Sequence, residues 1–182
     1  MLSVSFRASR TALISCLLLW GSSTVAQVNP AWVDPPVRPG DIAASKPAAQ
    51  AAHALAVDYL DHWSAPNRLM LAAASSFYGS TVTFHGRERT LDSVLAEKRR
   101  FAERWPQRTY RYRPETTMVA CESDGARCTV WAIFDFSAAG SGQDRRSVGI
   151  GEHELVVSLS SGRPVIVSET SRVLHRGAVK NR

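Results

Sequence analysis

The spacing of the hydrophobic residues changes once along this chain of 182 residues, close to residue 106. Before that point, apolar side chains recur every three or four residues, as on one face of a helix. Beyond it they alternate with polar side chains, as in a strand with one buried face. Helices that precede a run of strands joined by short turns are typical of an α+β domain. The chain is therefore predicted to form N-terminal helices packed on a mostly antiparallel sheet.

Three helices are expected before the change, over residues 45–64, 67–79 and 90–105. A short strand over residues 81–85 separates the last two. The helix ends are predicted from capping hydroxyls, from an early proline and from residues that stop a helix. In chain order, these residues are Ser45, Pro47, Gly79, Thr90 and Pro106.

Four strand segments are expected after the change, and the first is bent near Pro114. The last two hairpins are predicted to turn at residues 138–142 and 160–164, which are rich in Gly, Ser and Pro. The expected strands cover residues 108–121, 128–137, 146–159 and 165–174.

The N-terminus has the order of a secretory signal peptide: two arginines, an apolar run and then small residues that end at Ala26. Residues 1–26 are therefore predicted to be removed on export, which places the protein in the periplasm or outside the cell. Two alternatives are an uncleaved N-terminal anchor and a lipid on Cys16. Residues 27–44 are rich in proline and are expected to form a flexible leader, or an arm on the domain surface anchored by Trp32. Residues 177–182 are expected to be a disordered tail.

The positive charge of the chain is modest once the signal is removed. Residues 1–26 contain two arginines and no acids, so their loss lowers the net charge from +6 to +4. No nucleic-acid-binding motif accompanies this charge, and no partner of that kind is expected. No other stretch is long and apolar enough for stable membrane insertion. A local cluster at Lys98, Arg99 and Arg100 leaves open an interaction with anionic envelope polymers.

Two cysteines remain after the signal, at positions 121 and 128. An even pair in an exported chain predicts a disulfide. The residues between them form a turn sequence, which would place Cys121 and Cys128 opposite each other on adjacent strands. A zinc or redox site lacks the spacing and the further ligands, so no cofactor is expected.

The order helix, helix, short strand, helix and long strands resembles the nuclear transport factor 2-like superfamily, with the domain spanning residues 45–176. Several short strings also resemble uncharacterised exported bacterial members of that superfamily. These strings are Phe77-Tyr78, Val94 to Phe101, Arg104 to Pro106, Arg108 to Tyr110 and Ile166 to Glu169.

The resemblance implies a cone-shaped fold, with a pocket between a strongly curved sheet and three helices. It also implies a homodimer, since members often pair through the sheet. The catalytic motifs of ketosteroid isomerase and limonene epoxide hydrolase have no residue-by-residue match here. The pocket therefore carries over from the resemblance, and no catalytic residue does.

Two charged residues fall on apolar faces. Lys98 lies on the apolar stripe of the third expected helix, and Glu169 shares a face of the last strand with Val165, Val167 and Val173. A buried charge needs a partner, so Lys98 and Glu169 are expected to pair. The pair has two interpretations, a structural link between helix and sheet or a site with Glu169 as a general base.

Other candidate residues are less well defined. Asp135 shares a strand face with Trp131 and Ile133, and could face the pocket or the solvent. His85 is expected at an exposed loop end. His153 lies between Glu152 and Glu154, but its side chain would point to the opposite face of the strand, so the three do not form a metal site. The aromatic residues are expected in the core, and four are candidates for the pocket wall: Tyr59, Trp63, Tyr78 and Trp131.

These observations favour an exported module that binds a small apolar ligand or a protein partner. The first alternative is a small-molecule isomerase or hydrolase, with Glu169 or Asp135 as general base and Lys98 or Tyr78 polarising the substrate. The second is a protein that interacts with envelope polymers.

Overall fold

A computed structural model of the protein describes residues 36–38, 41–42, 46–141 and 146–177. The expected signal peptide, Trp32, Ser45 and residues 178–182 lie outside the described residues. No helix in the described part of the chain is long and apolar enough to cross a membrane.

Three helices and a 3-10 turn form close to the predicted positions. They are α1 (Pro47–Ser64), α2 (Asn67–Ala73), η2 (Ala74–Phe77) and α3 (Leu91–Arg104). The Thr90 hydroxyl accepts a hydrogen bond from the Ser93 amide, which confirms the predicted cap of α3. The prediction that Gly79 ends a helix is wrong: the helical segment stops at Phe77 and Gly79 lies within the next strand.

Seven strands make one sheet. They are β1 (Tyr78–Phe84), β2 (Arg87–Thr90), β3 (Gln107–Tyr112), β4 (Met118–Cys121), β5 (Arg127–Ala139), β6 (Arg146–Ser158) and β7 (Val165–Arg176). The strand order is β2-β1-β7-β6-β5-β3, and β4 also pairs with β5. All neighbours are antiparallel except β1 and β7. The predicted α+β class and mostly antiparallel sheet are therefore confirmed.

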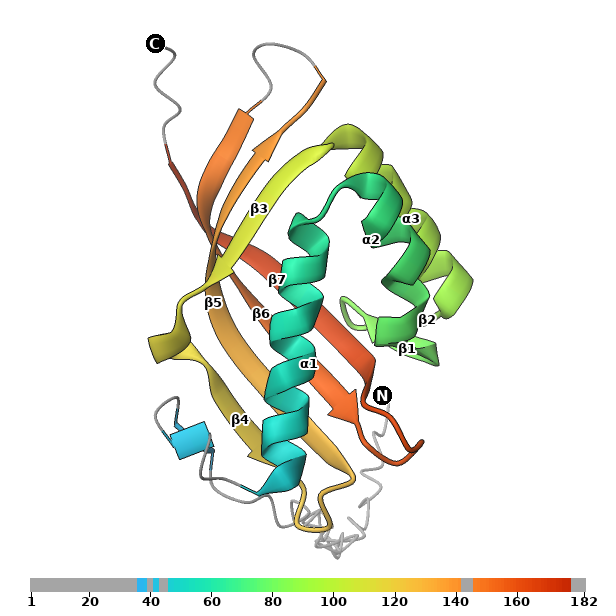
Figure 1. Ribbon diagram of the computed structural model, residues 1–182, viewed down its shortest axis with the longest axis vertical. Coiled ribbons are helices and arrows are strands. Elements are labelled where there is room, and N and C mark those ends of the chain that lie inside the picture. The colour runs from blue at the N-terminus through green and yellow to red at the C-terminus, as the bar shows by residue number, and fades with distance from the viewer. Residues whose placement is uncertain (1–35, 39–40, 43–45, 142–145, 178–182) are drawn as a thin grey trace, which may run out of the picture.

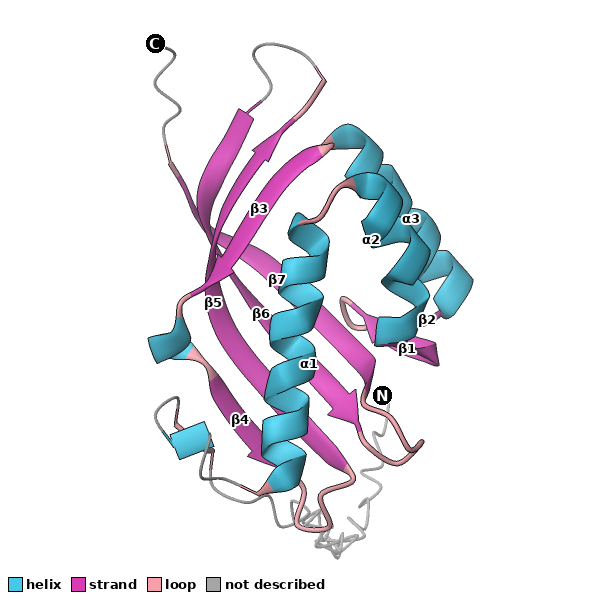
Figure 2. Ribbon diagram, in the orientation of Figure 1, coloured by secondary structure: helices cyan, strands magenta, loops and turns pink. Residues whose placement is uncertain are grey.

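The sheet is curved, and all three helices lie on one face of it (Figure 2). Helix α1 runs along the hollow of that face, with α2 and α3 beside it over the end formed by β1 and β2 (Figure 1). The buried residues fill the space between α1 and the inner faces of the long strands. This arrangement agrees with the predicted cone.

Two predicted strand boundaries need correction. Residues 108–121 form two strands, because the 3-10 turn η3 (Pro114–Thr116) separates β3 from β4. Both strands pair with β5, β3 along its second half and β4 along its first half. Ala138 and Ala139, expected in a hairpin loop, belong to β5 and pair with β3 and β6.

Cys121 and Cys128 form a disulfide, as predicted. The two residues are direct partners in the pairing of β4 with β5. Both are buried, so the bond closes the end of this hairpin within the core.

The proline-rich leader contacts the domain at two points. Val37 pairs with Val119 through two backbone hydrogen bonds, of 2.6 and 3.2 Å, at the free edge of β4. Ile42 is buried in the core. In its described residues the leader is thus in contact with the domain.

A buried arginine joins the ends of the helices, and this role was not predicted. Arg108 on β3 is 5% exposed. Its guanidinium donates to backbone carbonyls at the C-terminal ends of α1 and α3, where the last turns leave oxygens unpaired. The acceptors are the carbonyl oxygens of Trp63, Ala65, Ala102 and Trp105 and the side-chain oxygen of Asn67.

Two bulges interrupt the alternation of β7. The first lies between the pairs Val157–Ile166 and Val156–Ser168, so one extra residue enters β7 there. The second lies between the pairs Gly151–Val173 and Ile150–His175. Each bulge reverses which residues of the strand face inward. Because of the first, Glu169 is in phase with Ile166, and the predicted shared face with Val165 is wrong.

Candidate functional site

A cavity of about 320 Å³ lies between the inner face of the sheet and the helices. It is open to solvent on one side, and its wall is largely aromatic. The aromatic side chains of this wall come from the α1 and α3 segments and from strands β1, β3 and β5. The aromatic wall residues are Tyr59, Trp63, Phe84, Phe101, Trp105, Tyr110, Phe134 and Phe136.

Two glycines on β6 give the phenyl rings of β5 their positions. Phe134 is paired with Gly151, and Phe136 with Gly149, across the two strands. A Cβ atom at Gly151 would come within 2.5 Å of the Phe134 ring, and one at Gly149 within 3.0 Å of the Phe136 ring. The absence of side chains on β6 therefore lets both rings lie across that strand and line the cavity.

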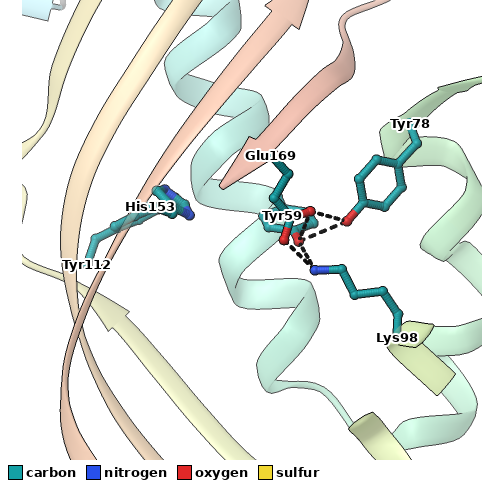
Figure 3. A network of polar contacts seen from close by, with 6 residues as sticks. All are labelled: Tyr59, Tyr78, Lys98, Tyr112, His153 and Glu169. Carbon is teal, nitrogen blue, oxygen red and sulfur yellow. Dashed lines mark hydrogen bonds and ion pairs between the residues drawn. The ribbon is translucent and has the colours of Figure 1, made fainter. Parts of the chain in front are cut away.

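Glu169 is at the deep end of the cavity, where it is 2% exposed. Its carboxylate accepts hydrogen bonds from three elements that are far apart in the sequence (Figure 3). The Tyr78 hydroxyl donates to Oε2 at 2.6 Å and the Tyr59 hydroxyl donates to the same oxygen at 2.9 Å. The Lys98 ammonium forms an ion pair with Oε1. Both oxygens of the buried carboxylate are therefore satisfied, and the predicted Lys98–Glu169 pair is confirmed.

The Lys98 ammonium is itself surrounded by partners. It donates to Glu169 and, at 2.7 Å, to the Tyr59 hydroxyl oxygen. It also lies 4.6 Å from the ring centroid of Trp63, a cation–π distance. The Lys98 side chain is only 14% exposed, and its charge is paired within the network rather than with solvent.

The network has a clear effect on protonation. Burial alone would raise the pKa of Glu169, but the charge of Lys98 and the hydrogen bonds from Lys98, Tyr78 and Tyr59 outweigh it, and the pKa is lowered. Burial and the nearby charge of Glu169 raise the pKa values of Tyr59 and Tyr78 well above the usual range. The four groups thus hold one carboxylate anion, one ammonium cation and two neutral phenols. A carboxylate with a lowered pKa and no free oxygen is a weak general base.

A second polar pair lies on the sheet, and its histidine lines the cavity. His153 on β6 is 3% exposed, and its Nε2 atom is hydrogen-bonded to the Tyr112 hydroxyl on β3. Burial lowers the pKa of His153 to about 4, with a smaller opposing effect from Glu169. The imidazole is therefore neutral at pH 7. In Figure 3 this pair lies to one side of the Glu169 network.

The structure brings together five of the predicted site residues. Tyr59, Trp63, Lys98 and Glu169 line the cavity, and Tyr78 contacts Glu169 directly behind it. His85 is exposed at the loop end after β1, as predicted, and lies at the cavity margin.

Asp135 and Trp131 are in a different place, on the outer face of the sheet. Asp135 is exposed and pairs with Arg113 at 2.7 Å, so it does not face the pocket. Trp131 donates from its indole nitrogen to Glu154 at 2.7 Å and lines a second hollow on that outer face. The alternation of β5 explains both positions, because Val130, Ala132 and Phe134 take the inner face.

The orientation predicted for His153 is confirmed. It faces inward, whereas Glu152 pairs with Arg172 and Glu154 bonds Trp131 on the outer side. No group of three or more His, Cys, Asp or Glu residues suited to a metal ion occurs in the part of the chain that the structure describes. The sequence analysis missed the pairing of His153 with Tyr112 and the role of Phe134 and Phe136 as cavity wall. The alternation of side chains along β5 and β6 could have predicted these positions, since it places Phe134, Phe136 and His153 on the inner face of the sheet.

Comparison with known proteins supports the fold. No family model and no curated protein matches this chain. Solved structures of the same fold do match. A protein from Novosphingobium aromaticivorans that is provisionally assigned as a scytalone dehydratase has a TM-score of 0.58 and 9% identity, over 73% of this chain and 88% of that one.

Two further structures give a similar result. An uncharacterised protein with a cystatin-like fold from Caulobacter vibrioides has a TM-score of 0.57 and 11% identity, over 71% of this chain and 92% of that one. A protein provisionally assigned as an aromatic ring hydroxylase, from Novosphingobium aromaticivorans, has a TM-score of 0.53 and 14% identity, over 69% and 88%. These structures show the fold alone: the chain has a cystatin-like α+β fold, in agreement with the cone that the resemblance implied.

The Lys98–Glu169 pair should be important for stability. We expect Lys98→Met to lower the free energy of unfolding by about 3–5 kcal/mol, because it leaves a buried carboxylate without its cation. Glu97→Gln is the matched control, since Glu97 is the adjacent residue and its ion pair with Arg89 is partly exposed to solvent. That change should cost less than about 1 kcal/mol. Equal effects of the two substitutions, measured by urea denaturation, would contradict the structure.

The neutral state of His153 predicts a dependence of stability on pH. The unfolded chain binds a proton at this histidine below pH 6.5, whereas the folded chain binds it only near pH 4. Stability should therefore fall as the pH drops from 6.5 toward 4, by about 2 kcal/mol at pH 5 from this group. Urea denaturation at pH 7 and pH 5 measures this loss. The His153→Gln variant should lack it, while His85→Gln, at an exposed histidine, should keep it. The same loss in all three proteins would contradict the assignment.

Proposed function

We propose that the protein is a binding module that holds a small, largely apolar molecule in the cone cavity. The observation that carries this proposal is an aromatic-lined cavity whose deep polar groups already bind one another. A concave, mostly apolar site with a few polar groups is the usual form of a small-molecule site.

The aromatic wall favours a ligand with a flat ring. Rings stack or meet edge to face with aromatic side chains, and the cavity presents such side chains from α1, α3 and β5. Trp63 adds a hydrogen-bond donor: its buried indole N–H has no partner among the described residues. A buried donor of this kind is normally satisfied, and an acceptor atom on a bound molecule would supply the missing bond. A neighbour of the same fold is provisionally assigned as an aromatic ring hydroxylase, which fits this ligand class.

Binding is favoured over catalysis because of the state of Glu169. A general base needs a free oxygen and a pKa near the working pH. Glu169 has neither, since its oxygens accept three donors and its pKa is lowered. Asp135 lies on the outer face. The isomerase or hydrolase alternative has no group in the required place among these candidates.

We also propose that the protein acts outside the cytoplasm. The N-terminal segment has the order of a signal peptide, and the disulfide between Cys121 and Cys128 is consistent with an oxidising compartment.

The proposal is tested by titrating the protein with 2-naphthylmethanol, a neutral ring compound, in a calorimeter. We expect binding of one molecule per chain. Ser171→Phe should remove it, because Ser171 lines the cavity and a phenyl ring there fills it. Trp131→Phe, on the outer face, is the control and should bind as the unchanged protein does.

Val173→Trp tests the same point without altering the deep cavity. Val173 lines the cavity and is 46% exposed, so a larger side chain there narrows the entrance while leaving the core intact. Binding that is unaffected by both cavity variants, or lost only in Trp131→Phe, would place the site elsewhere and overturn the proposal.

A further inference from the structure

We propose that the ligand of this cavity carries a carboxylate, which Arg176 binds at the cavity mouth while the apolar body of the ligand lies inside. This inference rests on the proposed binding function and adds the charge and the orientation of the ligand. Three features of the molecule support it: the second bulge of β7, the pairing of the charges in the cavity lining, and the hydrogen-bond network of Glu169 at the deep end.

The second bulge turns Arg176 toward the cavity. Val173 pairs with Gly151, and after the extra residue Arg176 pairs with Gly149. Gly149, Gly151 and His153 are alternate residues of β6, so they share its inner face. In a regular strand, Val173 and Arg176 would face opposite sides, since they are three residues apart. The bulge places both on the cavity side. Bulges that redirect a side chain are frequent beside functional sites.

Arg176 differs from the other cations of the cavity lining. Lys98 pairs with Glu169, and Arg172 pairs with Glu152 on the outer face. Arg176 has no carboxylate partner among the residues that the structure describes. Its guanidinium donates a single hydrogen bond, of 2.7 Å, to the Ser147 hydroxyl. The remaining donors of this exposed guanidinium are free to take a carboxylate in a bidentate geometry.

The acidic side chain of Glu97 does not prevent an anion from binding at Arg176. Glu97 also lines the cavity, but it pairs with Arg89 at 3.2 Å. The lining therefore contains three Lys or Arg side chains and two Glu side chains. The excess positive charge belongs to Arg176, at the mouth.

The deep end of the cavity determines the orientation. Lys98 is the cation at this end among the described lining residues, and an anion bound there would have to displace Glu169. That displacement would leave a buried carboxylate without its partner, which is strongly unfavourable. The ligand therefore enters with its apolar end first, and its charged group stays at the mouth, beside Arg176 and Ser147.

The test compares two probes of nearly equal shape, 2-naphthoate and 2-naphthylmethanol, by calorimetry at pH 7.5. We expect the unchanged protein to bind 2-naphthoate about ten-fold more tightly than the alcohol. Arg176→Met should remove this preference and leave the affinity for the alcohol within about two-fold. Arg172→Met is the matched control, an arginine at the same rim that is held by Glu152, and it should keep the preference.

The outcomes separate this inference from the function on which it rests. If both probes bind equally and Arg176→Met changes neither, the carboxylate assignment is overturned and the binding function stands. If the preference for 2-naphthoate persists in Arg176→Met but is lost in Arg172→Met, the assignment to Arg176 is overturned. If neither probe binds, the binding function and this inference both fail.

Discussion

The arrangement of this protein depends on one buried carboxylate. Removing a charged group from water is very costly unless donors replace the water. Glu169 on β7 obtains its donors from Tyr59 on α1, Tyr78 on β1 and Lys98 on α3. The Tyr59 hydroxyl links the same elements, because it also contacts Tyr78 and Lys98. The need to satisfy one carboxylate therefore holds two helices and the parallel β1–β7 pair against the long antiparallel strands, and this leaves the cavity between them.

The same network separates the cavity into two chemically different ends. At the deep end, donors and acceptors are matched, so a ligand finds aromatic surface and few free polar atoms. At the mouth, Arg176 donates to the Ser147 hydroxyl and has no carboxylate partner among the described residues. The two bulges of β7 place the charged side chains at both ends of the cavity. One bulge brings Glu169 onto the inner face of the sheet, and the other does so for Arg176. The glycines of β6 complete the site by giving Phe134 and Phe136 room.

The sequence predicted the class, the order of the elements and the central ion pair, and it did so for physical reasons. Lys98 and Glu169 each lie on an otherwise apolar face, and a buried charge needs a partner of opposite sign. This requirement identified them as a pair. Strand β2 was not predicted, because Arg87–Thr90 has no apolar alternation and forms only as the hairpin partner of β1. The bulges could not be predicted for a related reason. A strict alternation of side chains does not reveal an extra residue, so Val165 was assigned to the face of Glu169. Asp135 could have been placed, since its neighbours Phe134 and Phe136 belong to the apolar face of the same strand. Arg108 could not, because four of the five acceptors of its guanidinium are backbone carbonyls, which carry no sequence signal.

The most direct test of this account is the ionisation of Glu169. A ¹³C NMR titration of its carboxyl carbon, assigned by comparison with Glu169→Gln, measures the pKa in the folded protein. The account predicts a pKa below that of an ordinary glutamate, and a signal that barely moves when 2-naphthoate is added, because the ligand does not reach the carboxylate. A raised pKa, or a large change in that signal on binding, would contradict it and would make Glu169 a group that acts on the ligand.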